Sequence, residues 1–209
     1  MIYYDPARHH RRSIRLRGYD YTAAAGYFIT ICTHDQEPIF GEIVGKRMRL
    51  NAFGEIAWAE WFNTAAVRPY VRLYGDEFVV MPNHVHGIIW IVGDDDDDGR
   101  GGRTSAGATR RVAPPNGADP ITTGVVPATT RPNGPPPASI GAIIAQYKSI
   151  VTKRINEIRT TPGATVWQRN YYDHIIRNEE ECCRIREYIV TNPLRWENDW
   201  ENLNKTLDR

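Results

Sequence analysis

The sequence predicts an α+β fold in which an antiparallel sheet is covered by helices on one face. Three observations support this class: short runs of β-forming residues, longer segments whose apolar residues recur every three or four positions, and an order that mixes the two kinds. Along the chain the elements are a strand, a hairpin, a helix, two strands, an insertion, a helix, a strand and a helix. This order favours one layer of strands packed against one layer of helices.

Composition places the chain among globular proteins. It has 209 residues, of which 41% are hydrophobic, and this length suits a core of about 150 residues with additional segments. Only three cysteines are present, and the adjacent pair Cys182 and Cys183 is poorly placed to bridge itself, so we expect a reducing compartment. No apolar run is long enough to cross a membrane or to form a signal peptide. We therefore expect a cytoplasmic protein.

The first half of the chain contains five strand-like runs and one helix. The runs are residues 27–33, 42–44, 48–50, 77–81 and 84–92. Gly45 and Lys46 separate the second run from the third, which indicates a hairpin. A helix is predicted over residues 51–67, with Asn51 as its N-cap. Pro82 and Asn83 separate the last two runs by a turn or bulge.

The second half begins with a helix whose apolar stripe leaves a basic face outside. The stripe consists of Ile140, Ile143, Ile144, Tyr147, Val151, Ile155 and Ile158. A strand is predicted over residues 166–176. The next helix is predicted from Asn178, its cap, to about Thr191. Pro193 closes this helix, because the residue before a proline is biased out of the helical region.

Local charge and composition vary strongly, although the net charge is only +1. Residues 94–139 are rich in Gly, Pro, Thr, Ala and Arg without any period, so we expect a disordered insertion within a single domain spanning residues 1–209. Residues 1–18 contain five arginines and one aspartate and form a basic N-terminal arm. Residues 140–160 contain four basic residues and one glutamate. These two patches could face a phosphate backbone.

His84 and His86 form the clearest candidate for chemistry. On a strand they point to the same side, about 7 Å apart along the backbone, while Val85 points to the apolar side. Two imidazoles so placed can converge on one divalent metal ion. The alternative is two partly buried histidines with ordinary hydrogen bonds. Nucleotide hydrolases with three alternating histidines are disfavoured because Ile88 stands in the third position, and the His-Glu-x-x-His pattern of zinc peptidases is absent.

Tyr188 is the candidate nucleophile. It lies on the last predicted helix, beside the apolar stripe and one turn before Asn192. A phenol has a pKa of about 10 and is a poor nucleophile without a cation or base beside it. A metal ion would supply that cation. Three other tyrosines compete: Tyr171 and Tyr172 on the predicted strand, and Tyr147 on an apolar helix face where packing explains it better.

Longer stretches around these residues resemble a known family. Residues 81–89 (MPNHVHGII) are similar to the HUH motif, histidine–hydrophobe–histidine, of single-tyrosine transposases. Residues 167–177 and 187–195 resemble the C-terminal half of those enzymes. More narrowly, the chain resembles the REP-associated tyrosine transposases of bacteria, which the arginine-rich start, residues 18–21 and residues 27–33 also fit. The likeness covers nearly the whole chain except residues 94–139.

The resemblance implies a ferredoxin-like HUH nuclease fold and a role in the reaction for each of the candidate residues. His84 and His86 would hold Mg²⁺ or Mn²⁺, and Tyr188 would form a 5′-phosphotyrosine link while cutting and rejoining single-stranded DNA at hairpin-forming palindromic repeats. Asn192 stands where related transposases have a glutamine that completes the metal site, and it can bind the ion directly or through water. The expected DNA contacts are Arg11, Arg12, Arg15, Arg17, Lys148, Lys153, Arg154 and Arg169.

Two other functions remain open from the sequence. A domesticated relative could grip structured DNA or RNA without cutting it, although such a binder has no need for a histidine pair and a phenol. A metal-dependent hydrolase could use water in place of tyrosine and would leave no protein–DNA adduct. We expect a monomer, with a dimer as the alternative, in the bacterial cytoplasm in association with the nucleoid and without a membrane partner.

Overall fold

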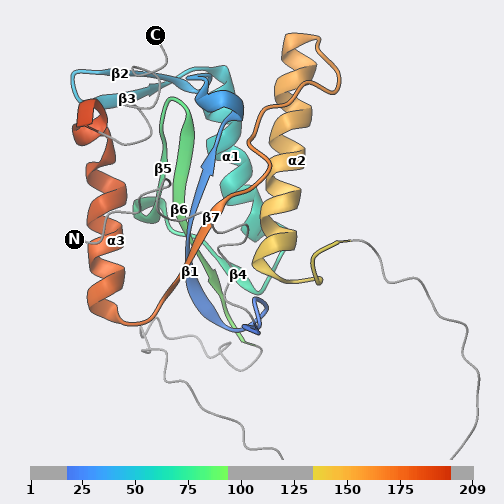
Figure 1. Ribbon diagram of the computed structural model, residues 1–209, viewed down its shortest axis with the longest axis vertical. Helices are drawn as coiled ribbons and strands as arrows, with labels where there is room; N and C mark the ends of the chain where they lie inside the picture. The colour runs from blue at the N-terminus through green and yellow to red at the C-terminus, as the bar shows by residue number, and fades with distance from the viewer. Residues whose placement is uncertain (1–17, 94–133, 199–209) are drawn as a thin grey trace, which may run out of the picture.

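The computed structural model describes residues 18–93 and 134–198, which form the α+β fold that the sequence predicts (Figure 1). The elements in chain order are β1 (Ala25–Cys32), η1 (His34–Gln36), β2 (Gly41–Val44), β3 (Arg47–Leu50), α1 (Ala52–Ala66), β4 (Val71–Arg72), η2 (Gly75–Glu77), β5 (Phe78–Val80), β6 (His84–Ile91), α2 (Ile140–Arg159), β7 (Tyr172–Ile176), α3 (Glu179–Thr191) and η3 (Asn192–Asn198).

The main sheet has five strands in the order β4-β6-β1-β7, with β5 also paired to β6. All of its pairings are antiparallel, as predicted. The strands before and after residues 94–133 share this sheet, because β7 pairs with β1. The β2–β3 hairpin forms a separate two-stranded sheet, and Figure 1 shows it crossing the end of the molecule where α3 finishes.

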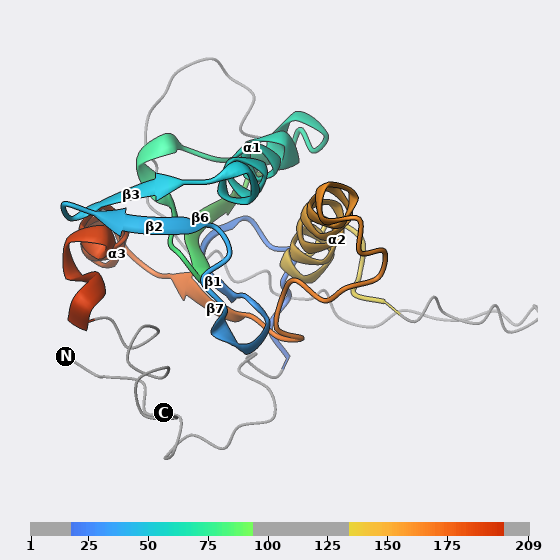
Figure 2. The same ribbon diagram turned by 90° about the horizontal axis from the view of Figure 1, so that it is seen from above.

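Helices cover both faces of the sheet. On one face, Tyr27 and Ile29 of β1 pack with Trp61 of α1 and Tyr147 of α2 in the large apolar core. This face agrees with the prediction. On the other face α3 covers the sheet (Figure 2), and a smaller apolar cluster that includes Ile88 lies between them. The prediction that helices cover one face of the sheet is therefore incomplete, because α3 covers the other face. The alternate positions of β6 also carry apolar side chains, which need a cover of their own.

Side-chain caps fix where the helices begin. Asn51 Oδ1 accepts hydrogen bonds from the Phe53 and Gly54 amides at 2.9 and 3.1 Å, as predicted. Asn178 Oδ1 accepts from the Glu181 amide at 2.8 Å at the start of α3, also as predicted. Ser139 caps α2 and is only 2% exposed. The insertion predicted to reach residue 139 therefore ends earlier, because Ser139 belongs to the helix start.

Two local predictions differ from the structure, and one short strand is absent from the prediction. Of the strand predicted over residues 166–176, only residues 172–176 pair with β1 as a continuous strand. Trp167 forms an isolated β-bridge with Thr33. Asn192 keeps helical angles, φ −56° and ψ −45°, so Pro193 ends the α-helix without removing Asn192 from the helical region. The helical turn continues as η3 instead. The two-residue strand β4 has no recognisable sequence pattern of its own.

Some predicted features lie outside the described residues. These are Arg11, Arg12, Arg15 and Arg17 of the basic arm, and residues 94–133 of the insertion. Within residues 18–93 and 134–198, no helix has the length and apolar character needed to cross a bilayer.

Gly87→Ala should destabilise the fold, because a methyl group at this position of β6 would overlap the rings of Trp61 and Phe78. Overpacking of this kind costs about 1–3 kcal/mol, and urea unfolding should show that loss. Gly93→Ala is the matched control, since a methyl group there enters open space. An unchanged unfolding midpoint for Gly87→Ala would contradict the packing of α1 on β6.

Candidate active site

His84 and His86 lie side by side on β6, on the face that α3 covers. Their ring centroids are 4.5 Å apart, and the residues are 0% and 3% exposed. Val85 between them enters the core on the opposite face, as the sequence predicts. Burial lowers the pKa of His86 to about 3. Burial, and secondly the charge of His86, lower the pKa of His84 well below its ordinary value. Both imidazoles are therefore neutral at neutral pH and keep a lone pair.

Hydrogen bonds at Nδ1 orient the two imidazoles. His84 Nδ1 lies 2.8 Å from Asn83 Oδ1. The Asn83 amide group donates to the Gln36 carbonyl at 3.2 Å, which leaves Oδ1 as the atom facing His84. An amide oxygen only accepts, so His84 Nδ1 carries the proton and its Nε2 carries the lone pair. His86 Nδ1 lies 2.8 Å from Thr30 Oγ1 on the neighbouring strand. Each ring is held by a partner outside the pair.

The phenol of Tyr188 reaches this pair from α3. Tyr188 Oη lies 3.3 Å from His86 Nε2, and the two ring centroids are 5.1 Å apart. Phe28 on β1 stacks on His86 at 5.6 Å and meets Tyr188 edge-on at 6.1 Å. Tyr188 remains 39% exposed. The predicted nucleophile and one predicted metal ligand are thus in contact, 102 positions apart in sequence.

In the sequence, Asn192 lies between two residues that lie close to the histidines. Tyr188, one turn earlier, touches His86. Trp196, one turn later, has its ring centroid 6.0 Å from that of His84. Asn192 is 1% exposed, and its Oδ1 has no hydrogen-bond partner within the described parts of the chain. The helical angles of Asn192 keep its side chain on the same flank as Tyr188.

The donor atoms at this site suit a divalent metal ion. His84 Nε2 is buried and, like Asn192 Oδ1, has no partner among residues 18–93 and 134–198. Unpaired buried polar atoms are rare and call for an explanation such as an ion or a water molecule. Imidazole nitrogens and an amide oxygen are ordinary ligands for such ions. No group of three His, Cys, Asp or Glu side chains offers a competing site in the described residues.

The other tyrosines differ in their access to the histidines. Tyr147 is 2% exposed, donates to the Ala57 carbonyl at 3.0 Å and lies on the opposite face, where burial raises the pKa of its phenol well above the ordinary value. Tyr171 packs against that same core. Tyr172 lies opposite Thr30 in the sheet, and its ring is 6.3 Å from Phe28. Tyr172 is therefore the nearest rival to Tyr188.

The ammonium group of Lys148 forms hydrogen bonds with backbone carbonyls of the same chain. Its Nζ donates to the carbonyls of Gln168 and Arg169, the latter at 3.2 Å, and burial lowers its pKa to about 8. These bonds link α2 to the segment before β7. Arg169 itself has an exposed side chain. A role for these two residues in DNA binding stays a prediction.

Lys153 and Arg154 lie on α2, across the sheet from the histidines (Figure 2). Arg154 forms an ion pair with the buried Glu60 of α1, and Lys153 lies 4.0 Å from Glu157 on an exposed surface. The structure does not bring these two cations to the histidine pair. Their predicted contacts with DNA would have to be made on another surface.

Sequence reasoning missed the residues that orient the imidazoles. Asn83 could have been noted, because an amide directly before the first histidine can reach its ring. Thr30 could be found only with the register of β1 and β6, which pairs it with His86. Trp196 gives no signal in the sequence, because its approach to His84 depends on the path of η3.

The burial of His86 makes stability depend on pH. Its folded pKa, about 3, is below the unfolded value of about 6.5, so the unfolded chain binds the extra proton as pH falls between these values. Stability should be complete above pH ~6.5 and decrease below it, by about 2 kcal/mol between pH 7 and pH 5 from this group. Urea unfolding in a chelator should show a smaller loss for His86→Gln. His34→Gln, at an exposed histidine, is the control and should retain the full loss.

No model of a known protein family matches the chain. A structure of a REP-associated tyrosine transposase bound to a REP hairpin is similar to 87% of this chain and 73% of that one, with 15% identity and a TM-score of 0.47. A Haemophilus influenzae protein described as "Uncharacterized protein" is 39% identical over 196 residues, which cover 94% of this chain and 95% of that protein. The chain therefore belongs to the same family as this Haemophilus influenzae protein.

Proposed function

We propose that this chain is a single-tyrosine transposase that cuts and rejoins single-stranded DNA, with Tyr188 as the nucleophile. The observation that carries the proposal is the 3.3 Å distance between Tyr188 Oη and His86 Nε2. A phenol placed against the paired imidazoles is the combination that this reaction requires. The resemblance of residues 81–89 and 187–195 to the HUH transposases supports the same assignment.

The proposal includes a divalent ion, Mg²⁺ or Mn²⁺, held by His84, His86 and Asn192. The unpaired His84 Nε2 and Asn192 Oδ1 support this set of ligands. When bound, the ion would supply the positive charge that stabilises a phosphate as its negative charge grows in the transition state. Asn83 and Thr30 hold the two imidazole rings in the orientation that ligation needs.

The reaction is a transesterification in which Tyr188 supplies the attacking oxygen. A bond forms between Tyr188 Oη and phosphorus, and the bond from phosphorus to the 3′-oxygen breaks. The phenol loses its proton and the 3′-oxygen gains one, so the step needs no oxidant and no ATP. The product is a 5′-phosphotyrosine with a free 3′-hydroxyl, and the attack of another 3′-hydroxyl rejoins the strand. Phe28 packs against the phenol ring and limits its movement.

The proposed substrate is single-stranded at the cut and folded into a hairpin nearby, as the family resemblance implies. The paired bases of a duplex would hinder an in-line approach of the Tyr188 oxygen to phosphorus. The imidazole of His84 is fully buried, and the ring of Trp196 in η3 lies 6.0 Å from it, centroid to centroid. Direct contact between DNA and His84 therefore requires the residues that cover this imidazole to move.

A covalent adduct is the decisive test. Purified protein is incubated with a labelled single-stranded hairpin oligonucleotide and Mn²⁺, and a denaturing gel should show labelled DNA bound to protein. Tyr188→Phe removes the attacking oxygen but retains the ring against Phe28, so the adduct should decrease by at least about 1000-fold.

Tyr172→Phe is the matched control, since Tyr172 is the nearest rival on the same face. It should form adduct at the wild-type rate. Loss of the adduct in Tyr172→Phe but not in Tyr188→Phe would identify Tyr172 as the nucleophile. Cutting without an adduct would favour a hydrolase that uses water, and tight binding without cutting would favour the non-catalytic binder.

Thr30→Val should weaken Mn²⁺ binding by about 10–100-fold, because it removes the hydrogen-bond partner of His86 Nδ1 without changing the side-chain shape. Isothermal titration calorimetry measures this affinity directly. Thr64→Val is the matched control: Thr64 is also buried, but its hydroxyl donates to the Glu60 carbonyl on α1. Equal Mn²⁺ affinities for Thr30→Val and wild type would contradict a metal site at the histidines.

A further inference from the structure

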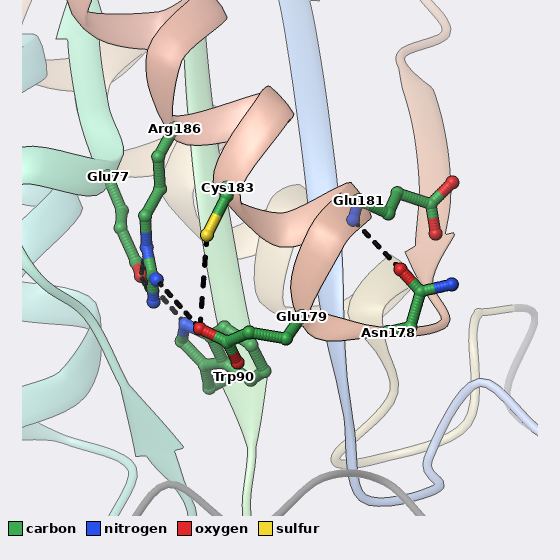
Figure 3. A network of polar contacts seen from close by, with 7 residues as sticks. All are labelled: Glu77, Trp90, Asn178, Glu179, Glu181, Cys183 and Arg186. Atoms are coloured by element: carbon green, nitrogen blue, oxygen red, sulfur yellow. Dashed lines mark hydrogen bonds and ion pairs between the residues drawn. The ribbon is translucent and has the colours of Figure 1, made fainter.

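A buried carboxylate, that of Glu77, joins α3 to the sheet through Arg186 and Trp90 (Figure 3). Glu77, at the end of η2, is 1% exposed. Its Oε1 accepts a hydrogen bond from Arg186 Nε at 2.7 Å and also contacts Nη2 of the same side chain. Its Oε2 accepts from Trp90 Nε1 at 2.6 Å. Both carboxylate oxygens are therefore occupied, one by the helix and one by β6.

An apolar cluster lies beneath α3. Its buried members are Ile88, Ile176, Cys182 and Ile189. Apolar contact is not directional, so it resists separation of α3 from the sheet more than it resists rotation or sliding. Hydrogen bonds to a charged group are short and directional. The Glu77–Arg186 pair can therefore set the rotation of α3 about its own axis.

Arg186 and Tyr188 lie on opposite flanks of α3. Two residues along an α-helix are about 200° apart around the axis, and the sheet-facing residues Ile185 and Ile189 lie between them. Because both flanks belong to one rigid helix, a rotation that moves Tyr188 Oη from His86 also moves the Arg186 guanidinium from Glu77. The ion pair on one flank thus opposes displacement of the phenol on the other.

Trp90 connects the same carboxylate to the strand of the histidines. It lies on β6, four residues after His86, and its indole N–H donates to Glu77. Glu77 therefore holds α3 relative to the strand that carries His84 and His86. On the Tyr188 flank, Glu181 adds a second link through His174 on β7 at 2.8 Å.

We infer that Glu77 is a positioning residue for Tyr188. It holds Arg186 and Trp90 together, and so keeps the phenol of α3 against His86 without touching substrate. The inference rests on the proposed function for its catalytic consequence, but the position of Tyr188 can be measured without any reaction.

Fluorine NMR of protein labelled with 3-fluorotyrosine tests the position, with Tyr188→Phe identifying the Tyr188 resonance. In Glu77→Gln this resonance should move toward that of free 3-fluorotyrosine. The rate constant for adduct formation should fall by about 10–100-fold with KM for the hairpin unchanged, because misplacement of a reacting group affects the chemical step.

Glu60→Gln is the matched control. Glu60 is also buried and also pairs with an arginine, but it lies between α1 and α2 on the opposite face. This variant should leave the Tyr188 resonance and the rate constant unchanged. Equal changes in Glu60→Gln and Glu77→Gln would reduce the effect to general destabilisation and overturn the inference.

An unmoved Tyr188 resonance in folded Glu77→Gln would also overturn it. If Glu77→Gln does not fold, Arg186→Lys replaces it: the charge remains, but a lysine ammonium cannot reproduce the planar guanidinium whose Nε and Nη2 both contact Glu77 Oε1. Its Tyr188 resonance should move in the same direction. If wild-type protein forms no adduct, the proposed function fails, while the resonance still decides whether Glu77 positions Tyr188.

Discussion

The pairing of β1 with β6 creates both the core and the candidate site. The register places Thr30 opposite His86 and Ile29 opposite Gly87. Along each strand, side chains alternately enter the large core or face α3. The same strand pair therefore contributes residues to the core and to the candidate site. A one-residue shift in the register of β6 would turn the histidines into the core. The apolar side chains of β6 that now form the core would then face α3. The core beneath α1 and α2 therefore fixes the side on which the imidazoles lie.

Burial determines the chemical state of the site. Removing the imidazoles from water disfavours their charged form, which lowers the pKa of His86 to about 3. A neutral imidazole is the form that can bind a metal ion. Asn83 and Thr30 then decide where each ring points, because each occupies an Nδ1 atom. The same environment that makes these histidines costly to protonate thus keeps them in the neutral form that the proposed metal site requires.

Elements with strong local signals could be predicted from the sequence, and features set by tertiary contacts could not. The caps at Asn51 and Asn178 and the alternation around His84 and His86 are local, and the structure agrees with them. The placement of α3 over the second face depends on how the sheet is assembled. The bond between Glu77 and Arg186 spans 109 positions, and no periodicity in the sequence indicates it.

The cover over His84 has a consequence for selectivity. A DNA strand can contact the exposed part of the Tyr188 side chain, but the imidazole of His84 is fully buried and closed to it. If the site acts on DNA, a ligand must form enough contacts of its own to offset the displacement of the residues that cover His84. Short or unstructured strands offer few such contacts, whereas a folded hairpin offers many. Discrimination against incidental single strands would then arise from the closed resting state, before any base is read.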